Sequence, residues 1–523
     1  MIFKAARSNI VTPAEVPGSP VPQPSASRRL SLAEPRSGPR HKTGVTMGAV
    51  LALALAGCSM EPKYVQPAAP VPPSWPVGDA YLAGSEATLP AVTYRDIFRD
   101  ARLQKLIERA LTENRDLRLA AANIRAARAQ YRIQRADRFP EVTAGIGATA
   151  SDGQSGSSAS AASGSGTRTR FTADAGITGF ELDLFGRVAS LTRAEQNRYF
   201  ATEAGARATY LTLVGDIADA WLRYAADASL LKIAQDTASN AENSVRLTRA
   251  RLEGGIAPRT DLRQAEQVLE GARADLAEQR TALAQDVNAL QLLIGAPVDP
   301  ALLPASLDEA APTIAELPAG IDSSVLLRRP DVVQAEYALR AANAEIGAAR
   351  AALFPRISLT GLLGLASNAL TGLFSGGGFN WSAGADANYS IFNAGAGRAN
   401  VRLTEAQREA AVATYERAIQ SAFREVADAL ARRGTITEQL RATQAQSEAA
   451  ADTFRLAEAR YRGGIDTFLS SLDAQRSLYS ARRTLVNTRL VQASNLVTLY
   501  RTLGGDSLLR ATPQGPEGAA PQP

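Results

Sequence analysis

The chain has 523 residues, of which 57 are Lys or Arg and 52 are Asp or Glu. Residues 1–57 hold seven of the basic and two of the acidic residues, so the rest of the chain carries 50 of each (57 − 7 and 52 − 2). This balance argues against nucleic-acid binding. The only histidine, His41, also lies in residues 1–57, which removes histidine-dependent nucleophiles and the usual zinc ligands from the rest. We therefore expect a structural or transport protein without enzymatic activity, metal or cofactor.

The chain begins with a predicted leader. Residues 1–46 are rich in Pro, Ser and Arg, a composition typical of disorder. The apolar run Met47–Gly57 has 11 residues. A membrane-spanning helix needs about 20 residues, whereas the core of a signal peptide needs about 7 to 15. The run therefore indicates a signal peptide.

The only cysteine, Cys58, follows Leu-Ala-Gly, and this sequence resembles a bacterial lipobox. The resemblance implies that residues 1–57 are removed and that Cys58 receives N-acyl and S-diacylglycerol chains. Such chains anchor a protein at about 0.8 kcal/mol per buried CH₂. A buried core cysteine is the alternative, but the proline-rich segment after Cys58 offers no core. We interpret residues 58–98 as a lipid-anchored linker.

The rest of the chain contains an internal repeat. Segments 215–221, 250–266 and 290–295 align with segments 424–430, 459–475 and 499–504, each 209 residues further along. One offset shared over such a span predicts two copies of one unit. The predicted divisions are a first copy at 99–295, a linker at 296–326, a second copy at 327–505 and a disordered tail at 506–523.

Both copies show the same order of predicted elements. An alanine-rich helix ends at Phe-Pro, because proline cannot continue a helix. Two strands with alternating character follow, and then a proline-free helix that is too polar for lipid and must pack in coiled-coil fashion. The expected elements are helix 101–138, strands 141–150 and 169–185, helix 188–253 with a return to 295, helix 331–353, strands 356–367 and 379–392, and helix 399–462 with a return to 504.

Each long helix is expected to turn at a glycine pair, because glycine readily adopts the left-handed conformation that ends a helix. The expected turn residues are Gly254, Gly255, Gly463 and Gly464. We expect the two turns to lie together at one tip.

Four strands cannot close a barrel alone, and open strand edges are not tolerated in lipid. Either the strands form a soluble sheet or several chains pool them. Their lengths suit membrane strands, which need about 9–11 residues. Aromatic residues that would form interface girdles lie near the strand ends, namely Phe171, Phe180, Trp381, Tyr389 and Phe392.

Three stretches resemble a known family. Residues 327–364, including LRRPDVVQAEYALRAANAEIGAARAALFPRISLTG, and residues 461–486 resemble the outer membrane efflux proteins, the TolC-like channels. The motif FGRV at 185–188 does so too. More narrowly, these stretches resemble the lipoprotein branch that serves RND-type multidrug pumps.

The resemblance implies an internally duplicated α+β membrane protein that acts as a homotrimer. Four strands per chain would give a 12-stranded transmembrane β-barrel in the cell outer membrane, and the long helices would form a coiled-coil tunnel through the periplasm. The implied partners are a periplasmic membrane-fusion adaptor, an inner-membrane RND transporter and outer-membrane lipid. Drugs or other small molecules would pass through without catalysis.

The resemblance also identifies candidate gate residues at the periplasmic tip. Leu469, Asp473 and Arg476 are spaced by four and three residues, so they share one helix face. Three copies of Asp473 would form a cation-selective acidic ring, and three copies of Leu469 an apolar constriction. Hydrogen bonds from Tyr461 or Arg476 to Asp473 would hold the tip closed. Asp261 and Asp466 are further candidates for facing the lumen, and an ordinary helix surface is the alternative for the whole set.

Two other functions stay open at this point. A type I protein-secretion outlet would share the fold, but the lipobox and the match at 327–364 favour small-molecule efflux. A surface-anchored coiled-coil scaffold without a pore would share the helices and the lipid anchor. Conductance and trimeric barrel behaviour would distinguish a channel from such a scaffold.

Overall fold

The computed structural model describes residues 59–76, 78, 80–81, 93–152, 167–315, 323–374, 377–505, 511–512 and 515–516. All of them belong to one unit, which comprises residues 57–523. Cys58 and the predicted leader lie outside the described residues. Within the predicted tail, β5 (Ala511–Thr512) and β6 (Gly515–Pro516) pair with each other.

The helices repeat at the predicted offsets. The first copy contains α3 (Ala101–Glu113), α4 (Arg115–Ala136), α5 (Arg187–Glu253) and α6 (Arg259–Ile294), and the second contains α8 (Pro330–Ala351), α9 (Ala396–Arg462) and α10 (Phe468–Thr502). Helices α5 and α9 have 67 residues each and begin 209 residues apart (396 − 187). Helices α4 and α8 have 22 residues each and begin 215 residues apart (330 − 115). The duplication is thus confirmed, and the second copy is six residues shorter between these helices.

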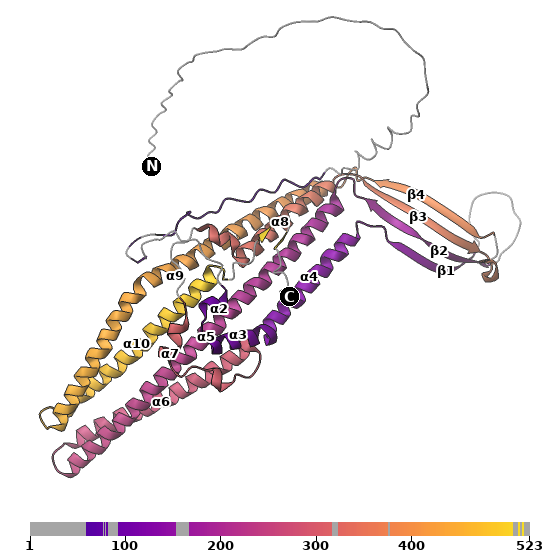
Figure 1. The fold of residues 1–523 in the computed structure, drawn as a ribbon. Coiled ribbons are helices and arrows are strands. Elements are labelled where there is room, and N and C mark those ends of the chain that lie inside the picture. The colour runs from indigo at the N-terminus through magenta and orange to yellow at the C-terminus, as the bar shows by residue number, and fades with distance from the viewer. Residues whose placement is uncertain are drawn as a thin grey trace, which may run out of the picture. The chain divides into compact units, whose positions relative to one another are not determined.

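The long helices α5 and α9 organise the helical part, and at 1.5 Å per residue each is about 100 Å long. Next to the strands the order of packed helices is α4, α5, α8, α9. Toward the turns the shorter helices change, and the order becomes α6, α5, α10, α9 (Figure 1). Among the described residues, no helix is both long enough and apolar enough to cross a membrane.

The prediction of one helix over 101–138 was wrong, because Asn114 divides it into α3 and α4. The Asn114 backbone is extended (φ −59°, ψ 137°), and its side-chain oxygen accepts a hydrogen bond from the Leu117 N–H at 3.0 Å. Its amide nitrogen donates to the Leu293 carbonyl at 2.7 Å. Asn114 therefore caps α4 and fixes the bend against the end of α6.

A four-stranded antiparallel sheet extends from the helices in the order β1 (Val142–Asp152), β2 (Thr167–Leu182), β3 (Arg356–Ser367), β4 (Phe379–Asn388). The strand register is continuous except between Ile177 and Phe180, where Gly179 has φ +67°. The last strand ends at Asn388, so Tyr389 and Phe392 lie just beyond it rather than within the predicted strand.

The main hydrophobic core lies where the middle of α5 and α9 meets α3, α6 and α10. Trp221 is fully buried there, and its indole N–H donates to the Leu302 carbonyl at 3.1 Å. Phe98 and Tyr500 meet edge to face at 5.2 Å. Short elements cover this region, namely α2 (Tyr94–Ile97), η1 (Pro300–Leu302), α7 (Leu307–Ala310), η2 (Ala311–Thr313) and η3 (Ser323–Arg328).

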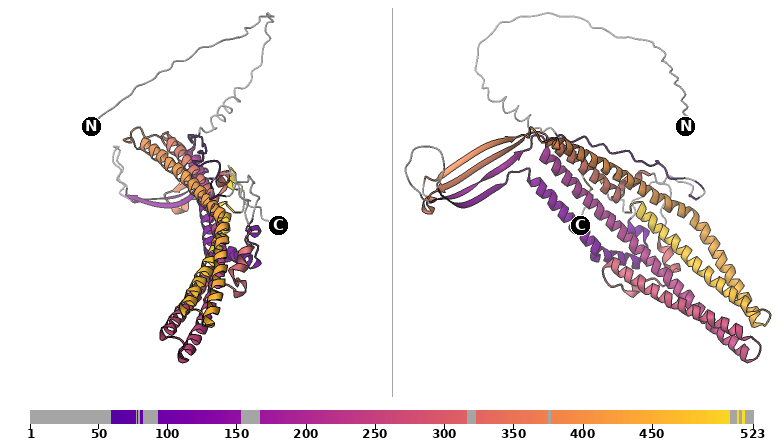
Figure 2. Two further views of the ribbon diagram at one scale, coloured as in Figure 1. Left: turned by 90° about the vertical axis from the view of Figure 1, so that its left-hand side faces the viewer. Right: turned by 180° about the vertical axis from the view of Figure 1, so that it is seen from behind.

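Residues 59–76, which we term the strap, contain neither helix nor strand and run along α8 and α9 (Figures 1 and 2). The amide of Gln66 donates to the Tyr415 hydroxyl at 3.0 Å, and Trp75 stacks on Phe423 at 4.9 Å. Ser323 donates to the carbonyls of Pro72 and Pro73 at 2.8 and 3.2 Å.

Candidate functional site at the helical tips

The two glycine turns have the same geometry. Gly255 and Gly464 have φ values of +72° and +73°, the left-handed region that favours glycine. The N–H of the following isoleucine returns to the carbonyl five residues earlier, from Ile256 to Arg251 at 2.8 Å and from Ile465 to Arg460 at 2.9 Å. This is a Schellman motif. The preceding glycines, Gly254 and Gly463, end the helices with φ of −76° and −74°, so they do not adopt the expected left-handed conformation.

The side chain of Tyr461 joins the second hairpin to the first. It is 6% exposed, and the guanidinium of Arg251 lies 4.8 Å from its ring centre. Arg251 also donates to the Tyr461 carbonyl at 2.9 Å, and the Tyr461 hydroxyl lies 3.4 Å from the Thr248 hydroxyl. Phe468 packs beside the ring at 5.4 Å. The two turns therefore lie next to each other, as the first two figures also show.

The three candidates on α10 lie on its exposed face. Leu469 is 52% exposed, and Asp473 and Arg476 are also exposed, whereas Phe468 and Leu472 on the other face are buried. Among the described residues, no hydrogen bond or ion pair joins Asp473 to another side chain. Within one chain, Tyr461 contacts Thr248 and Arg251 in place of Asp473.

The two further acidic candidates have local roles in the single chain. Asp466 lies in the second turn and accepts a hydrogen bond from the Arg460 guanidinium at 2.7 Å, which raises the pKa of Arg460. Asp261 is half-buried in the first turn of α6, where its N–H donates to the Pro258 carbonyl at 3.1 Å. In the part of the chain that the structure describes, no three His, Cys, Asp or Glu side chains gather as a metal site.

Sequence reasoning missed Arg251 and Thr248, because they belong to the first hairpin while Tyr461 belongs to the second. Their signal lies in the repeat itself. Arg251 and Arg460 are equivalent at the 209-residue offset, and Tyr461 is equivalent to Leu252. Only the second copy offers an aromatic ring, and only the first copy's arginine reaches across to it.

Comparisons with known proteins agree with this architecture. The sequence model of the family described as outer membrane efflux protein matches residues 106–296 and 322–505. The chain is 45% identical over 464 residues to the probable efflux pump outer membrane protein TtgC of Pseudomonas putida, covering 87% of this chain and 94% of that one. It is 40% identical over 456 residues to outer membrane protein OprJ of Pseudomonas aeruginosa, again covering 87% and 94%. The open MtrE outer membrane channel of Neisseria gonorrhoeae matches with a TM-score of 0.77 at 36% identity, covering 86% and 98%.

Duplicated helical hairpins that continue into a four-stranded sheet define the TolC-like class of fold, as the likeness to MtrE shows. The chain belongs to the outer membrane efflux protein family, with one matched segment in each copy. The resemblance seen in the sequence is thereby confirmed, together with the α+β fold and its four strands per chain.

Proposed function

We propose that this protein is the outer-membrane channel of a tripartite RND-type efflux pump. Three chains form one channel, which conducts drugs or other small molecules passively from the periplasm to the exterior, without catalysis. A periplasmic membrane-fusion adaptor and an inner-membrane RND transporter complete the pump. Lipid chains on Cys58 anchor each chain in the outer membrane.

The distribution of side chains over the sheet carries this proposal. In an antiparallel sheet, directly paired residues share a face. The paired positions of one face are all apolar or glycine, whereas those of the other are mainly polar or small. The apolar face comprises Val142, Ala144, Ile146 and Ala148, Phe171, Ala173, Ala175 and Ile177, Leu359, Gly361, Leu363 and Leu365, and Phe379, Trp381, Ala383 and Ala385.

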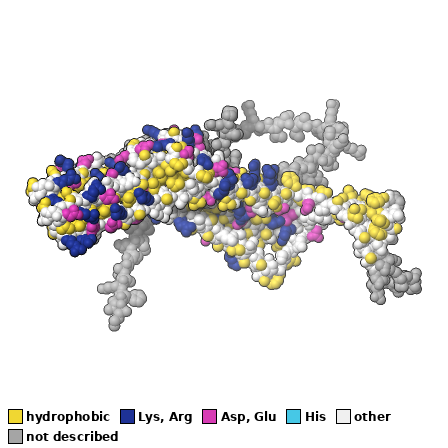
Figure 3. Space-filling model, turned by 90° about the horizontal axis from the view of Figure 1, so that it is seen from below, with side chains coloured by type: hydrophobic (Ala, Val, Ile, Leu, Met, Phe, Trp, Pro, Cys, Tyr) yellow, Lys and Arg dark blue, Asp and Glu magenta, His cyan; other side chains and the backbone are white. Residues whose placement is uncertain are grey.

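Large side chains of this face are exposed in the single chain. Ile146 is 87% exposed, Trp381 68% and Leu363 59%. Figure 3 shows hydrophobic side chains gathered over the strand end, while charged side chains are spread over the helices. A face that is apolar across all four strands suits contact with lipid, and the opposite face suits a water-filled lumen.

The unpaired edges support assembly from several copies. Strands β1 and β4 each have one neighbour in the sheet, and the helical layers begin with α4 or α6 and end with α9. Each layer thus begins with an element of the first copy and ends with one of the second. Joining chains head to tail pairs these edges, and a closed ring leaves none of them open. Three chains would supply 12 strands.

In the proposed trimer, the exposed face of α10 at the tip faces the channel axis. The Leu469 side chains narrow the opening, and three Asp473 carboxylates attract cations. The Arg251–Tyr461 contact holds the two hairpins of one chain together, so that the tip opens when hairpins move relative to neighbouring chains.

The first test measures ethidium accumulation in cells. Deletion of the gene should raise accumulation, and the wild-type gene should reverse it. Unchanged accumulation after deletion would overturn the assignment to drug efflux and favour a secretion outlet or a narrower cargo.

The second test measures single-channel conductance in planar bilayers. Asp473→Ala should raise conductance and reduce cation selectivity, because the acidic ring is lost. Glu278→Ala removes an exposed acid on α6 and serves as the matched control. Absence of any conductance in the wild-type protein would favour the scaffold, and an Asp473→Ala channel equal to wild type would refute the gate assignment.

A further inference from the structure

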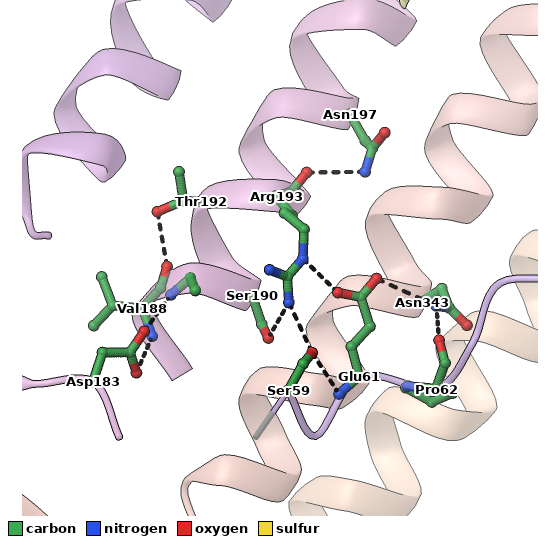
Figure 4. A network of polar contacts seen from close by, with 11 residues as sticks. Ser59, Glu61, Pro62, Asp183, Val188, Ser190, Thr192, Arg193, Asn197 and Asn343 are labelled. Atoms are coloured by element: carbon green, nitrogen blue, oxygen red, sulfur yellow. Dashed lines mark hydrogen bonds and ion pairs between the residues drawn. The ribbon is translucent and has the colours of Figure 1, made fainter. Parts of the chain in front are cut away.

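The strap begins at a polar cluster that ties it to two helices (Figure 4). The Glu61 carboxylate accepts a hydrogen bond from the Arg193 Nε on α5 at 2.6 Å. Arg193 also donates to the Ser59 hydroxyl at 3.1 Å. On α8, the amide of Asn343 donates to the Pro62 carbonyl at 2.8 Å. We call Glu61, Arg193 and Asn343 the clasp.

The clasp is closely packed. Asn343 is fully buried, and Glu61 is 19% exposed in the ion pair with Arg193. A Cβ on Gly347 would lie 2.9 Å from the Glu61 Cα and 2.8 Å from the Ser190 hydroxyl oxygen. Glycine at this position therefore lets the strap backbone rest directly on α8, with no space for a side chain between them.

The clasp lies at the strand end of the helices. Arg193 is in the second turn of α5, which begins at Arg187, and six residues of helix rise about 9 Å. The preceding joint is itself fixed, because the Asp183 carboxylate accepts hydrogen bonds from the N–H groups of Val188 and Ala189 at 3.1 and 2.7 Å. A second ion pair joins Arg187 to Glu181 on β2 at 2.7 Å.

This placement bears on the residue before the strap. The Cα of Cys58 is one peptide unit, about 3.8 Å, from that of Ser59. Whatever is attached to Cys58 is therefore held near the level at which β2 becomes α5. Under the proposed function, this is also the level at which the channel leaves the membrane.

We infer that the clasp is a positioning device for the lipid anchor. It holds Cys58 at the height of the strand ends, so that the acyl chains and the strands enter the same bilayer. The inference rests on the lipidated channel proposed above and adds the residues that set the height of the anchor. Without the clasp, the strap would let the anchor move away from the sheet that it should deliver to the membrane.

The strap offers a direct readout of clasp closure. Only three lysines follow residue 57, and Lys105 and Lys232 lie within helices, so a lysine-specific protease should cut first after Lys63. Cleavage there separates the lipidated end from the channel. Since such cleavage tracks the population of the open segment, opening the clasp should speed it by about tenfold or more.

The experiment compares Arg193→Glu, Glu61→Arg and the double exchange in detergent-solubilised full chains. Each single variant should be cleaved faster after Lys63 and should insert less oligomer into the outer membrane, while intact mass shows unchanged lipidation. The double exchange should restore both. The matched control is Arg350→Glu, which breaks the Arg350–Glu405 pair at 2.8 Å between α8 and α9 without touching the strap.

Two results would overturn the inference. Unchanged cleavage of Arg193→Glu would show that the clasp does not hold the strap, and fast cleavage with normal membrane insertion would show that it does not position the anchor. Cys58→Ala separates this inference from the proposed function. Protection of Lys63 should persist in it, because the clasp does not need the lipid, whereas a wild-type chain without lipid would refute the proposed anchor alone.

Discussion

Helices α4 and α8 are equivalent in the duplication and equal in length, yet their surroundings differ. No residue of α4 is buried, whereas fourteen of the 22 residues of α8 are. Helix α8 packs between α5 and α9 under the strap, while α4 packs against α5 alone as the edge of its layer. The same unit thus supplies an interior element in one copy and an edge in the other.

This difference shows how a duplicated chain prepares for assembly. The edge copy keeps apolar side chains that nothing covers in the single chain, such as Leu119 and Ile133 at 60% and 61% exposure. They are 14 residues apart, about four helical turns, and so lie on one side of α4. In the proposed trimer, α9 of a neighbouring chain covers this side.

The largest effect is expected from breaking the edge. Leu119→Glu combined with Ile133→Glu should abolish the trimer, because each buried, unpaired carboxylate costs several kcal/mol. The monomer should keep its helical content. Native gel electrophoresis and circular dichroism measure the two properties, with the exposed Gln130→Glu on the same helix as control. A stable trimer of the double variant would show that α4 is not at the interface.

A side chain at Gly347 should be the next most damaging change. Gly347→Leu forces an overlap with the strap and should cost about 1–3 kcal/mol. The equivalent position on α4 is Arg132, which is exposed, and Arg132→Leu should change stability by no more than about 0.5 kcal/mol. Thermal unfolding in detergent compares the two. Equal losses would contradict the interior-versus-edge distinction.

The caps of the same two helices differ as well. Asn114 caps α4 with its side chain, whereas the equivalent residue before α8 is Arg329, which makes no cap and instead pairs with Asp331 and Glu425 at 2.7 and 2.9 Å. Asn114→Ala should cost about 1–2 kcal/mol. Asn114→Ser keeps the cap and loses the bond to Leu293, so it should cost about half as much. Thermal unfolding of both variants tests this order, which a greater loss in Asn114→Ser would contradict.

The smallest effect concerns pH. Burial and a hydrogen bond with Asp227 raise the pKa of Asp286 to about 7 from 3.8. Because the folded state binds this proton more tightly than the unfolded state, stability should fall as pH rises from about 4 to about 7 and then level off. At the equivalent positions, the second copy has Ile436 and Asn495. Asp286→Asn should therefore remove the pH dependence and stabilise the protein above pH 7. A variant with the wild-type pH profile would exclude Asp286 as its source.

Local sequence patterns predicted most elements and few of the contacts between them. Glycine pairs and absent prolines placed α5 and α9 within three residues of their observed starts, and β3 has the predicted bounds. The break at Asn114 was missed, because its partner Leu293 lies 179 residues away and the surrounding residues favour helix. The clasp and the Arg251–Tyr461 contact were missed for the same reason. Both join residues more than 100 positions apart, which no periodicity reveals.

The equal length of α5 and α9 has a consequence for how this protein changes over generations. One residue inserted into only one of them would advance its turn by about 1.5 Å and rotate it by about 100°, separating Tyr461 from Arg251. Heritable changes in reach must therefore arrive in matched pairs, one in each copy. Steps of seven residues, about 10 Å, preserve the packing faces best. The chain is in this sense a ruler with two scales, and selection can lengthen it only by whole graduations on both.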